Sequence, residues 1–572
     1  MRIKKSVSKN SVSYSVIENV RDINGKSTTK VVEALGNEDE IRAKHPGVDP
    51  EEWARAYAKK LTEEKKKEQA PIIAKYHPRK LINKNQRRSY NVGYLFLQSI
   101  YYQLGLSQAI KGIQEKYKFQ FDLNEILSKL IYMRVLHPTS KKNSFEQAKS
   151  LLEGIHCEPH QMYRALDILH KETDFIQQVA YKNSLKLVDR HSKILYYDCT
   201  NYYFEIEEEE GYKRNGISKE NRPNPIVQMG LFMDASGLPL AFSIFPGNEN
   251  EQGSLKPLEK RILKDFELSE IIVCTDAGLS SEKNRIYNTL GNRGFITTQS
   301  IKKLKKHLKE WVLDPEGWHI TAGDKGINLS DIDDSPNNKN TYFKERWIKE
   351  GEIEQRLLVT FSPKYKHYQQ TIRERQINRA LKKIDKPSTL KKKRANDPAR
   401  FITAIHATKD GEIAEKTHFS IDEAAIQKEA QYDGFYGICT NLESDPKELI
   451  RINHKRWEIE ETFRVMKSEL KSRPVYVKKD CRIEAHFLTC FLALLIYRLL
   501  EKRVDEQFTC HEIIQTLREM KMMELSGEGY IPDYERTDIT DRLHEVFSFR
   551  TDYEIVLTKD IKKILKQTKK GK

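Results

Sequence analysis

The stretch "KILYYDCTNYYFEI" (residues 193–206) decides the fold of the region around it, because it has the composition of a buried β-strand. Aromatic and β-branched residues fill it, as they fill strands that pack against neighbours. After an acidic loop, "PIVQMGLFMDASGLPLAFSIFPG" (225–247) predicts two more strands joined at Ala-Ser-Gly. A helix over about 251–265, the strand "EIIVCTDAG", a helix over about 281–290 and the strand "GFITT" follow. This order predicts an α/β fold with a mixed sheet and helices on its faces.

Upstream of the sheet, alternating residues in 11–34 predict a β-hairpin around the turn "DINGK" (22–26), because Asn-Gly favours tight hairpin turns. A Lys/Glu-rich helix over about 50–68 follows, and residues 90–190 have helical periodicity. Two interpretations of this helical region stay open, a packing bundle or a DNA-binding module.

Downstream, residues 301–430 alternate strands with basic helices and are interpreted as an insertion. "YDGFYGICTN" then leads to "NHKRWEIEETFRVMK" (453–467), which is predicted to form one amphipathic helix. Its buried stripe is predicted to consist of Ile459, Phe463, Met466 and, beyond the quoted stretch, Leu470. The apolar run Phe487–Leu500 is too short to span a bilayer, so it fits a buried core helix.

The chain of 572 residues is too long for one compact domain, and its patterns divide it into six expected regions. They are an N-terminal β-hairpin arm with a linker helix (1–75), the helical region (76–190), the first part of an α/β core (191–300), the insertion (301–429), the second part of the core (430–505) and a basic C-terminal region (506–572).

The composition is that of a globular, basic protein, with 99 Lys+Arg against 83 Asp+Glu and a net charge of +16. Such a balance favours polyanionic partners, nucleic acid first. The seven cysteines are scattered without a Cys-x-x-Cys pair, which argues against a disulfide framework or a zinc site and for a reducing compartment. Because no apolar run follows the basic start, we expect no signal peptide, no membrane span and a cytoplasmic location.

Two aspartates occupy positions that suit a functional site. Asp198 interrupts the apolar strand and shares a face with Tyr196 and Thr200, although a half-exposed strand face would also explain it. Asp276 ends a later strand, where open α/β sheets build their sites, although Asp is also a common turn residue.

A third carboxylate lies on the predicted helix 453–467. Glu460 falls with Arg456 and Lys467 within about 40° of arc, beside the buried stripe. An ordinary Arg456–Glu460 ion pair of about 0.3 kcal/mol is the alternative.

The three carboxylates would converge if the strands and this helix pack in one layer. Clustered carboxylates repel one another and need a cation, and hard oxygen ligands suit Mg²⁺ or Mn²⁺. Two such ions about 3.5–4 Å apart stabilise the attacking and leaving oxygens of a phosphoryl transfer. Arg456 and Lys467 would then neutralise or position a phosphate backbone.

Other features fit structural roles better. The acidic run "EIEEEE" (205–210) is typical of a solvated loop, and His486 is typical of a core histidine. The sequence contains no Walker-type glycine loop, which excludes the usual nucleotide-driven motors.

The order of "YYDCT", "SKENRPNPIVQMGLFMDASGLPLAFSIFPGNENE", "VCTDAG" and "NHKRWEIEETFRVMKSEL" resembles the DDE transposases of bacterial insertion sequences. More narrowly, the chain is similar to the branch with a Tyr-x2-Arg-x3-Glu-x6-Lys signature. The resemblance covers about 190–300 and 430–500, and the N-terminal hairpin also looks like that branch's arm. It implies a ribonuclease-H-like core with a β-rich insertion.

The resemblance also implies roles for single residues. Asp198, Asp276 and Glu460 would be the catalytic acids and the metal ligands. The DNA-contacting positions would be Arg456, Lys467, Trp457 and Asn453. Asn453 stands where the signature has its tyrosine, so its contact to DNA is the open position.

The function implied is that of a DNA transposase, which hydrolyses a phosphodiester at the element ends and joins the freed 3′-hydroxyl to target DNA. Double-stranded DNA would be the partner, and a homodimer would bring two ends together. The alternatives are a ribonuclease-H-like nuclease without strand transfer and a domesticated DNA-binding factor without catalysis. An acid–base hydrolase of small substrates fits poorly with the positive charge.

Overall fold

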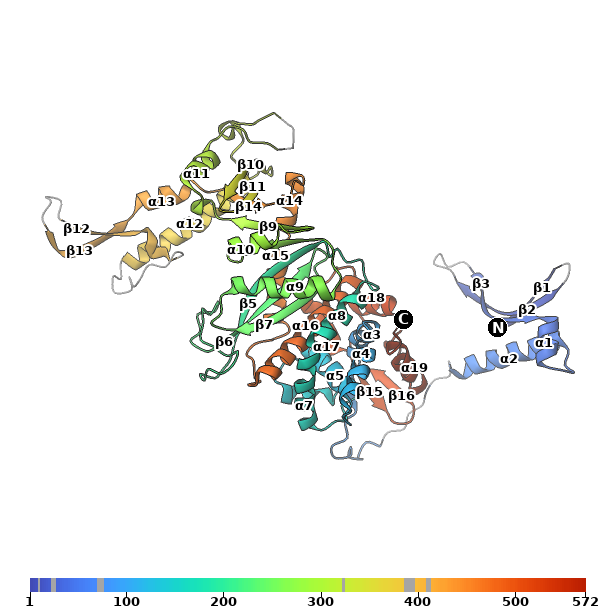
Figure 1. Cartoon of the computed structure of the whole chain (residues 1–572). Coiled ribbons are helices and arrows are strands. Elements are labelled where there is room, and N and C mark those ends of the chain that lie inside the picture. Colours follow the sequence, from blue (N-terminus) through green and yellow to red (C-terminus); the bar gives the residue numbers. More distant parts are fainter. Residues whose placement is uncertain are drawn as a thin grey trace. The chain divides into compact units, whose positions relative to one another are not determined.

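The computed structural model describes residues 1–8, 11–21, 27–68, 72, 77–320, 325–384, 397–407 and 413–571. Two compact units make up the chain, residues 1–86 with 525–528 and residues 87–524 with 529–572 (Figure 1). The predicted hairpin turn at 22–26 lies outside the described residues.

The first unit is a small antiparallel sheet with two helices. Its strands β1 (Arg2–Val7), β2 (Val12–Arg21) and β3 (Ser27–Asn37) pair in that order, and the helices α1 (Glu38–Lys44) and α2 (Pro50–Glu68) follow. The core of this unit consists of Tyr14, Val16, Leu35, Ile41, Ala54 and Ala58. Both strands of the predicted hairpin and the predicted helix over 50–68 are therefore confirmed.

The second unit is built on an eight-stranded mixed sheet of order β10-β11-β14-β9-β8-β5-β6-β7 (Figure 1). β5 runs parallel to β8 and β8 parallel to β9, whereas every other neighbouring pair is antiparallel. The predicted meander followed by alternating helices and strands is confirmed. The strands are β5 (Ile194–Tyr203), β6 (Ile226–Asp234), β7 (Pro239–Pro246), β8 (Ile271–Thr275), β9 (Arg293–Gln299), β10 (Tyr342–Glu350), β11 (Ile353–Phe361) and β14 (Phe435–Thr440).

Alternate side chains of β5 pack into separate cores on the two faces of the sheet. Tyr197 and Cys199 join the core with α9 (Leu255–Asp265), which is followed by α10 (Glu282–Tyr287). Tyr196 and Tyr202 join the larger core with α15 (Trp457–Ser468) and α16 (Asp480–Arg503). Period-two alternation along β5 thus separates the faces as predicted and leaves Asp198 on the side of α15.

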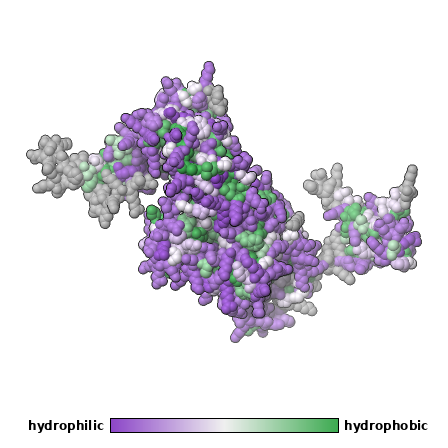
Figure 2. Space-filling model, in the orientation of Figure 1, coloured by the Kyte–Doolittle hydropathy of each residue, from purple (hydrophilic) through white to green (hydrophobic). Residues whose placement is uncertain are grey.

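The helix α16 is the centre of the larger core. It packs against β7 and against several helices of the region before β5. Within the described residues it is the one helix long and apolar enough to cross a membrane, yet 89% of its most apolar window is buried inside the protein. The predicted core helix is therefore confirmed, and Figure 2 shows an outer face that is mostly hydrophilic. The surrounding helices are α3 (Tyr94–Gln103), α4 (Leu106–Tyr117), α5 (Leu123–Leu136), α6 (Lys141–Ala148), α7 (Pro159–Leu169) and α8 (Thr173–Ser184).

The range 301–429 both extends the main sheet and forms a smaller core of its own. β10 and β11 join the sheet next to β14, whereas α12 packs with a two-stranded sheet around Ala380, Phe401 and Ile402. The remaining elements here are α11 (Lys306–Leu313), α12 (Pro363–Ile384), β12 (Ile402–Ala407), β13 (Ile413–Ile421) and α13 (Glu423–Ala430).

The C-terminal part adds α17 (Cys510–Glu519), α18 (Asp538–Phe547) and α19 (Thr558–Thr568). A four-stranded sheet of order β17-β16-β15-β4 lies among them. Its strands are β4 (Ser89–Asn91), β15 (Lys521–Leu525), β16 (Gly529–Pro532) and β17 (Val556–Leu557).

One prediction about the helix 453–467 is wrong, because this stretch is not continuous. α14 (Pro446–His454) ends and α15 begins on either side of Lys455 and Arg456. The backbone there forms tight bonds over three residues, from Arg456 N to Asn453 O (3.1 Å) and from Glu458 N to Lys455 O (3.0 Å), which redirect the chain. The predicted stripe of Ile459, Phe463, Met466 and Leu470 is nevertheless buried, as expected.

Candidate functional site

A cavity of about 490 Å³ lies between the middle of β5, the end of β8 and α15. It brings together residues that are far apart in the sequence. Five of the seven predicted site residues line it: Asp198, Asp276, Arg456, Glu460 and Lys467.

Asp198 is held in the middle of β5 by the strand itself. One of its carboxylate oxygens accepts a hydrogen bond from the backbone N–H of Cys199 at 2.7 Å. The pKa of Asp198 is raised to about 6, mainly by burial and to a lesser extent by the negative charge of Asp276. Lys219, the Cys199 N–H and Arg456 act in the opposite direction. Asp198 is therefore a carboxylate whose negative charge is poorly compensated in this structure.

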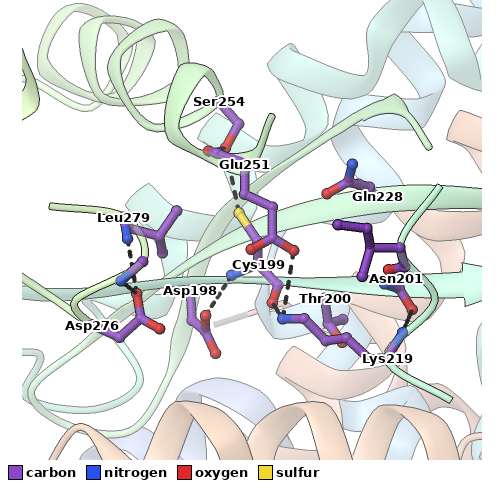
Figure 3. Close-up of polar contacts among 12 residues, drawn as sticks. Asp198, Cys199, Thr200, Asn201, Lys219, Gln228, Glu251, Ser254, Asp276 and Leu279 are labelled. Atoms are coloured by element: carbon purple, nitrogen blue, oxygen red, sulfur yellow. Dashed lines mark hydrogen bonds and ion pairs between the residues drawn. The ribbon is translucent and has the colours of Figure 1, made fainter. Parts of the chain in front are cut away.

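Asp276 follows the last residue of β8 and is fixed by its own turn. Its Oδ1 accepts hydrogen bonds from the backbone N–H groups of Gly278 and Leu279, both at 3.0 Å. Asp276 is thus the turn residue that the sequence allowed, and it also faces the cavity. Figure 3 shows the carboxylates of Asp276 and Asp198 lying side by side.

Glu460 and Arg456 form the ion pair that the sequence offered as the alternative. Arg456 Nη1 donates to Glu460 Oε1 at 3.0 Å, while the Glu460 side chain remains 58% exposed. Burial lowers the pKa of Arg456, but the Tyr436 hydroxyl and Glu460 outweigh this effect and raise it overall. Both residues also line the cavity, so Arg456 and Glu460 can form an ion pair and still belong to the candidate site.

Two lysines complete the wall beside Asp198. Lys467 Nζ donates to Thr200 Oγ1 at 2.6 Å. Lys219 Nζ donates to the carbonyl of Cys199 and lies 3.6 Å from Glu251 Oε1. The pKa of Lys467 is lowered to about 8, mainly by burial and to a lesser extent by the positive charge of Lys219. The negative charge of Asp198 acts in the opposite direction.

The donor set fits a hard divalent cation, although the three carboxylates are not gathered on one point. Within the described residues, no group of three His, Cys, Asp or Glu side chains is close enough to hold one ion. Asp198 and Asp276 each commit Oδ1 to backbone N–H groups, which leaves Oδ2 available, and Glu460 is turned towards Arg456. A cation would favour the charged form of Asp198, whose pKa is raised mainly by burial and to a lesser extent by Asp276, so these residues suit Mg²⁺ or Mn²⁺.

The other two predicted residues lie outside this cavity. Asn453 is 7% exposed, and its Nδ2 donates to Tyr436 Oη at 3.2 Å. Trp457 is 54% exposed and lines a different cavity, of about 550 Å³, with Lys455 and Lys502. The structure therefore does not bring Asn453 and Trp457 together with the three carboxylates.

Sequence reasoning missed three basic residues that line the cavity, Lys219, Arg464 and Arg473. Lys219 belongs to the loop before β6, which folds back over β5 and is held by Asn201. The Asn201 Nδ2 donates to Ile217 O at 3.0 Å, and its Oδ1 accepts from Lys219 N at 3.3 Å. Loop residues carry no periodic signal, and the buried polar Asn201 within an apolar strand was the only hint.

The two features assigned structural roles behave as predicted. Glu205 and the run Glu207–Glu210 are exposed and lie in a loop, where Glu210 pairs with Lys213 at 3.2 Å. His486 is 4% exposed and its Nε2 lies 3.1 Å from the carbonyl oxygen of Ser472.

Two family models match the chain. The one described as "Transposase DDE domain" matches residues 204–496, and the one described as "IS1634 family transposase, N-terminal domain" matches residues 1–72. The first range includes Asp276 and Glu460 and begins six residues after Asp198 (204 − 198 = 6). No curated protein matches the chain in sequence.

Solved structures of transposases resemble the chain only loosely. The piggyBac transposase synaptic complex with hairpin DNA is 8% identical, covers 83% of this chain and 84% of its own, and has a TM-score of 0.35. The Mos1 transposase paired-end complex with the left transposon end is 12% identical, covers 43% and 67%, and has a TM-score of 0.13. The Mos1 mariner paired-end complex with Mn is 12% identical, covers 45% and 70%, and has a TM-score of 0.14. TM-scores this low do not establish a shared fold.

Proposed function

The chain belongs to the DDE transposases, whose domain covers residues 204–496, and from that membership we propose that the cavity around Asp198, Asp276 and Glu460 is the catalytic centre. With its N-terminal match to an insertion-sequence family, the protein is an insertion-sequence transposase, an enzyme that cuts DNA in a metal-dependent reaction and transfers the strand. The expected resemblance is thereby confirmed. The observation that carries the catalytic assignment is that three acids from separate elements line one cavity with Arg456 and Lys467.

The residues that would hold the metal are Asp198, Asp276 and Glu460. When bound, Mg²⁺ or Mn²⁺, as two ions, supplies the charge that activates water and stabilises the leaving oxygen. Backbone N–H groups already orient Asp198 and Asp276, so these two carboxylates would have to move little to bind a metal ion. Glu460 has to turn away from Arg456 first.

The basic residues orient the DNA. Release of Glu460 frees the Arg456 guanidinium for a phosphate oxygen, which it binds in a fork geometry. Lys467 and Lys219 flank Asp198 and offset the charge of the same phosphate. In the first step water attacks phosphorus, the P–O3′ bond breaks, and the proton lost by water is balanced by the one gained at the departing 3′ oxygen. In the second step the freed 3′-hydroxyl loses its proton and attacks a target phosphate, whose own P–O3′ bond breaks to leave a 3′-hydroxyl on the target.

Several finer features belong to the same proposal. The sheet is a ribonuclease-H-like core in two parts, 191–300 and 430–505, interrupted by the insertion 301–429. The partner is double-stranded DNA, both element ends and target, and a homodimer holds two ends in the cytoplasm.

The Tyr-Arg-Glu-Lys branch is supported by Arg456, Glu460 and Lys467 on one wall of the cavity. The arm 1–75, the helical region 76–190 and the basic region 506–572 are proposed as further DNA-contacting parts, in keeping with the charge of +16.

The test is Glu460→Gln. We expect it to abolish Mg²⁺-dependent cleavage of a duplex carrying the element's terminal inverted repeat, because a neutral amide is a poor metal ligand, while the affinity for that duplex stays within about twofold. Cleavage is measured by gel and binding by fluorescence anisotropy.

The matched control is Glu461→Gln, the neighbouring carboxylate, which pairs with Arg464 one turn on and lines the other cavity. It should cleave at the wild-type rate. Cleavage by Glu460→Gln at the wild-type rate would refute the assignment. A pre-cut 3′ end that is never joined to target DNA would favour the nuclease without strand transfer.

A further inference from the structure

The outward face of α12 carries a stripe of exposed basic residues. At about 100° per residue, six exposed side chains fall within about 80° of arc. They are Lys364, Tyr368, Ile372, Arg375, Arg379 and Lys382, here called the α12 stripe. Among the residues that the structure describes, none forms an ion pair with the four cations of this stripe, whose six members include no carboxylate.

The opposite face of the same helix is built differently. There Arg373 Nη1 donates to the buried Asp433 at 2.7 Å and Lys366 pairs with Asp334, while Lys383, next to the edge of the stripe, pairs with Asp397 at 2.7 Å. Ala380 is fully buried and Gln369 accepts a hydrogen bond from the Gly434 backbone at 2.8 Å. These three cations are thus neutralised and fix α12 in place, whereas the four cations of the stripe have no ion-pair partner in the part of the chain that the structure describes.

We propose that the α12 stripe binds the phosphate backbone of a DNA duplex, outside the catalytic cavity. The inference rests on the proposed function, since it assumes that the chain acts on DNA. None of the stripe residues lines the cavity of Asp198, so this surface is a separate contact.

The dimensions of the stripe suit a duplex. From Lys364 to Lys382 the helix rises by about 27 Å, at about 1.5 Å per residue. A duplex presents one phosphate per about 1.7 Å of its axis, so each of the four cations has a phosphate within reach. Tyr368, 61% exposed and stacked on Tyr365, adds a hydroxyl that donates to a phosphate, and Ile372, 36% exposed, adds apolar contact.

The experiment replaces all four cations in the full-length protein, as Lys364→Gln, Arg375→Gln, Arg379→Gln and Lys382→Gln. Glutamine has a helix propensity close to those of lysine and arginine, so α12 should stay folded, which circular dichroism checks. We measure binding to a mixed-sequence duplex of several helical turns at increasing salt. The slope of log K against log salt should become shallower by about 2 to 4, and affinity should fall at least about tenfold.

A matched control removes the same charge from exposed lysines on three other helices, as Lys260→Gln, Lys264→Gln, Lys283→Gln and Lys447→Gln, which lie outside the regions 1–75, 76–190 and 506–572. Its slope should change by less than about 1. An α12 variant that behaves like this control overturns the proposal. So does an α12 variant that binds DNA normally but changes its oligomeric mass without DNA, which would assign the stripe to a second copy of the chain.

Two double variants, Lys364→Gln with Arg375→Gln and Arg379→Gln with Lys382→Gln, keep the proposal testable if the quadruple variant misfolds. Each should give about half of the change in slope. The salt titration also distinguishes a failure of the proposed function from a failure of this inference. If the proposed function is wrong, the wild-type protein itself would bind the duplex without salt dependence. If the wild type binds steeply and the α12 variants bind equally steeply, only the further inference fails.

Discussion

At the scale of single residues, the cavity that we propose as the catalytic centre is lined by three carboxylates and five cations. The cations are Arg456, Arg464, Lys467, Lys219 and Arg473. Asp198 and Asp276 are fixed by backbone N–H groups, whereas Glu460 is fixed only by Arg456. Glu460 is therefore the least constrained of the three carboxylates, and turning it away from Arg456 would free that arginine for the DNA contact that we propose.

Glu259, on α9, illustrates how a buried acid outside the site affects stability. It is fully buried, its Oε2 accepts from Asn288 Nδ2 at 3.2 Å, and its Oε1 has no hydrogen-bond partner among the described residues. Burial raises its pKa from 4.5 to about 7. The folded protein therefore holds a proton that the unfolded chain loses above pH 4.5, so stability falls as the pH rises from about 4.5 to about 7.

We therefore expect Glu259→Gln to stabilise the protein at pH 8 by roughly 1–3 kcal/mol, and to give little gain at about pH 3.5, below the unfolded value of 4.5, where the carboxyl is mostly protonated in both states. Thermal unfolding at the two pH values measures the difference. An equal gain at both, or a loss at pH 8, would show that the carboxylate is not the cause.

At the scale of elements, the strands β5–β9 and the stripe of α15 were predictable because their patterns are local. Alternation marks the faces of β5, and a period near 3.6 marks the buried side of α15. The break at Lys455 and Arg456 was not predictable, since both flanking helices have the same composition. The burial of Asn453 depends on Tyr436, which β14 brings from another part of the sheet.

This contact between α14 and β14 predicts the behaviour of Asn453. Tyr436 Oη also exchanges a hydrogen bond with Thr298 Oγ1 at 2.7 Å, so Asn453 is the buried member of a small, half-buried network. Asn453→Ala should lower the free energy of unfolding by about 1–2 kcal/mol, because the bond is lost and a small void is left. DNA affinity should change by less than about threefold.

Denaturant unfolding and anisotropy give both values. A loss of DNA affinity without a loss of stability would instead give Asn453 the DNA contact that the signature tyrosine makes in the family. Asn453→Asp is the matched control, since it keeps the size of the side chain but offers no amide donor to Tyr436.

At the scale of the whole molecule, the chain contains separate hydrophobic cores in its two units. The N-terminal core includes Ile41 and five other buried residues, whereas the core of the second unit is centred on α16 with Leu492 fully buried. Units with their own cores need not unfold together.

Calorimetry should therefore show more than one transition. Ile41→Ala should lower only the one that belongs to residues 1–86, and Leu492→Ala only the one that belongs to the second unit, each by about 2–5 kcal/mol. A single transition that both variants shift equally would contradict independent cores.

The sequence predicted the order of the strands and helices that line the cavity, but not every neighbour of those strands in the sheet or every residue that reaches the cavity. That β11 lies between β10 and β14 requires a register between Phe361 and Phe435 that no local pattern encodes. The same holds for Lys219, which reaches the cavity only because Asn201 holds its loop. Long-range pairing and loop anchoring depend on the folded surroundings, and these are what a single sequence specifies least directly.

The central place of α16 also has a consequence for how the protein is made. Its neighbour α5 ends at Leu136 and α16 begins at Asp480, so the ribosome adds 344 residues (480 − 136 = 344) before the early helices meet the segment that covers them. At about 5–20 residues per second this takes about 20 to 70 s. During this time α5, buried along most of its length in the finished protein, has no α16 to pack against. A nascent chain released before α16 emerges should therefore be a client for chaperones and proteases, with its apolar helices uncovered.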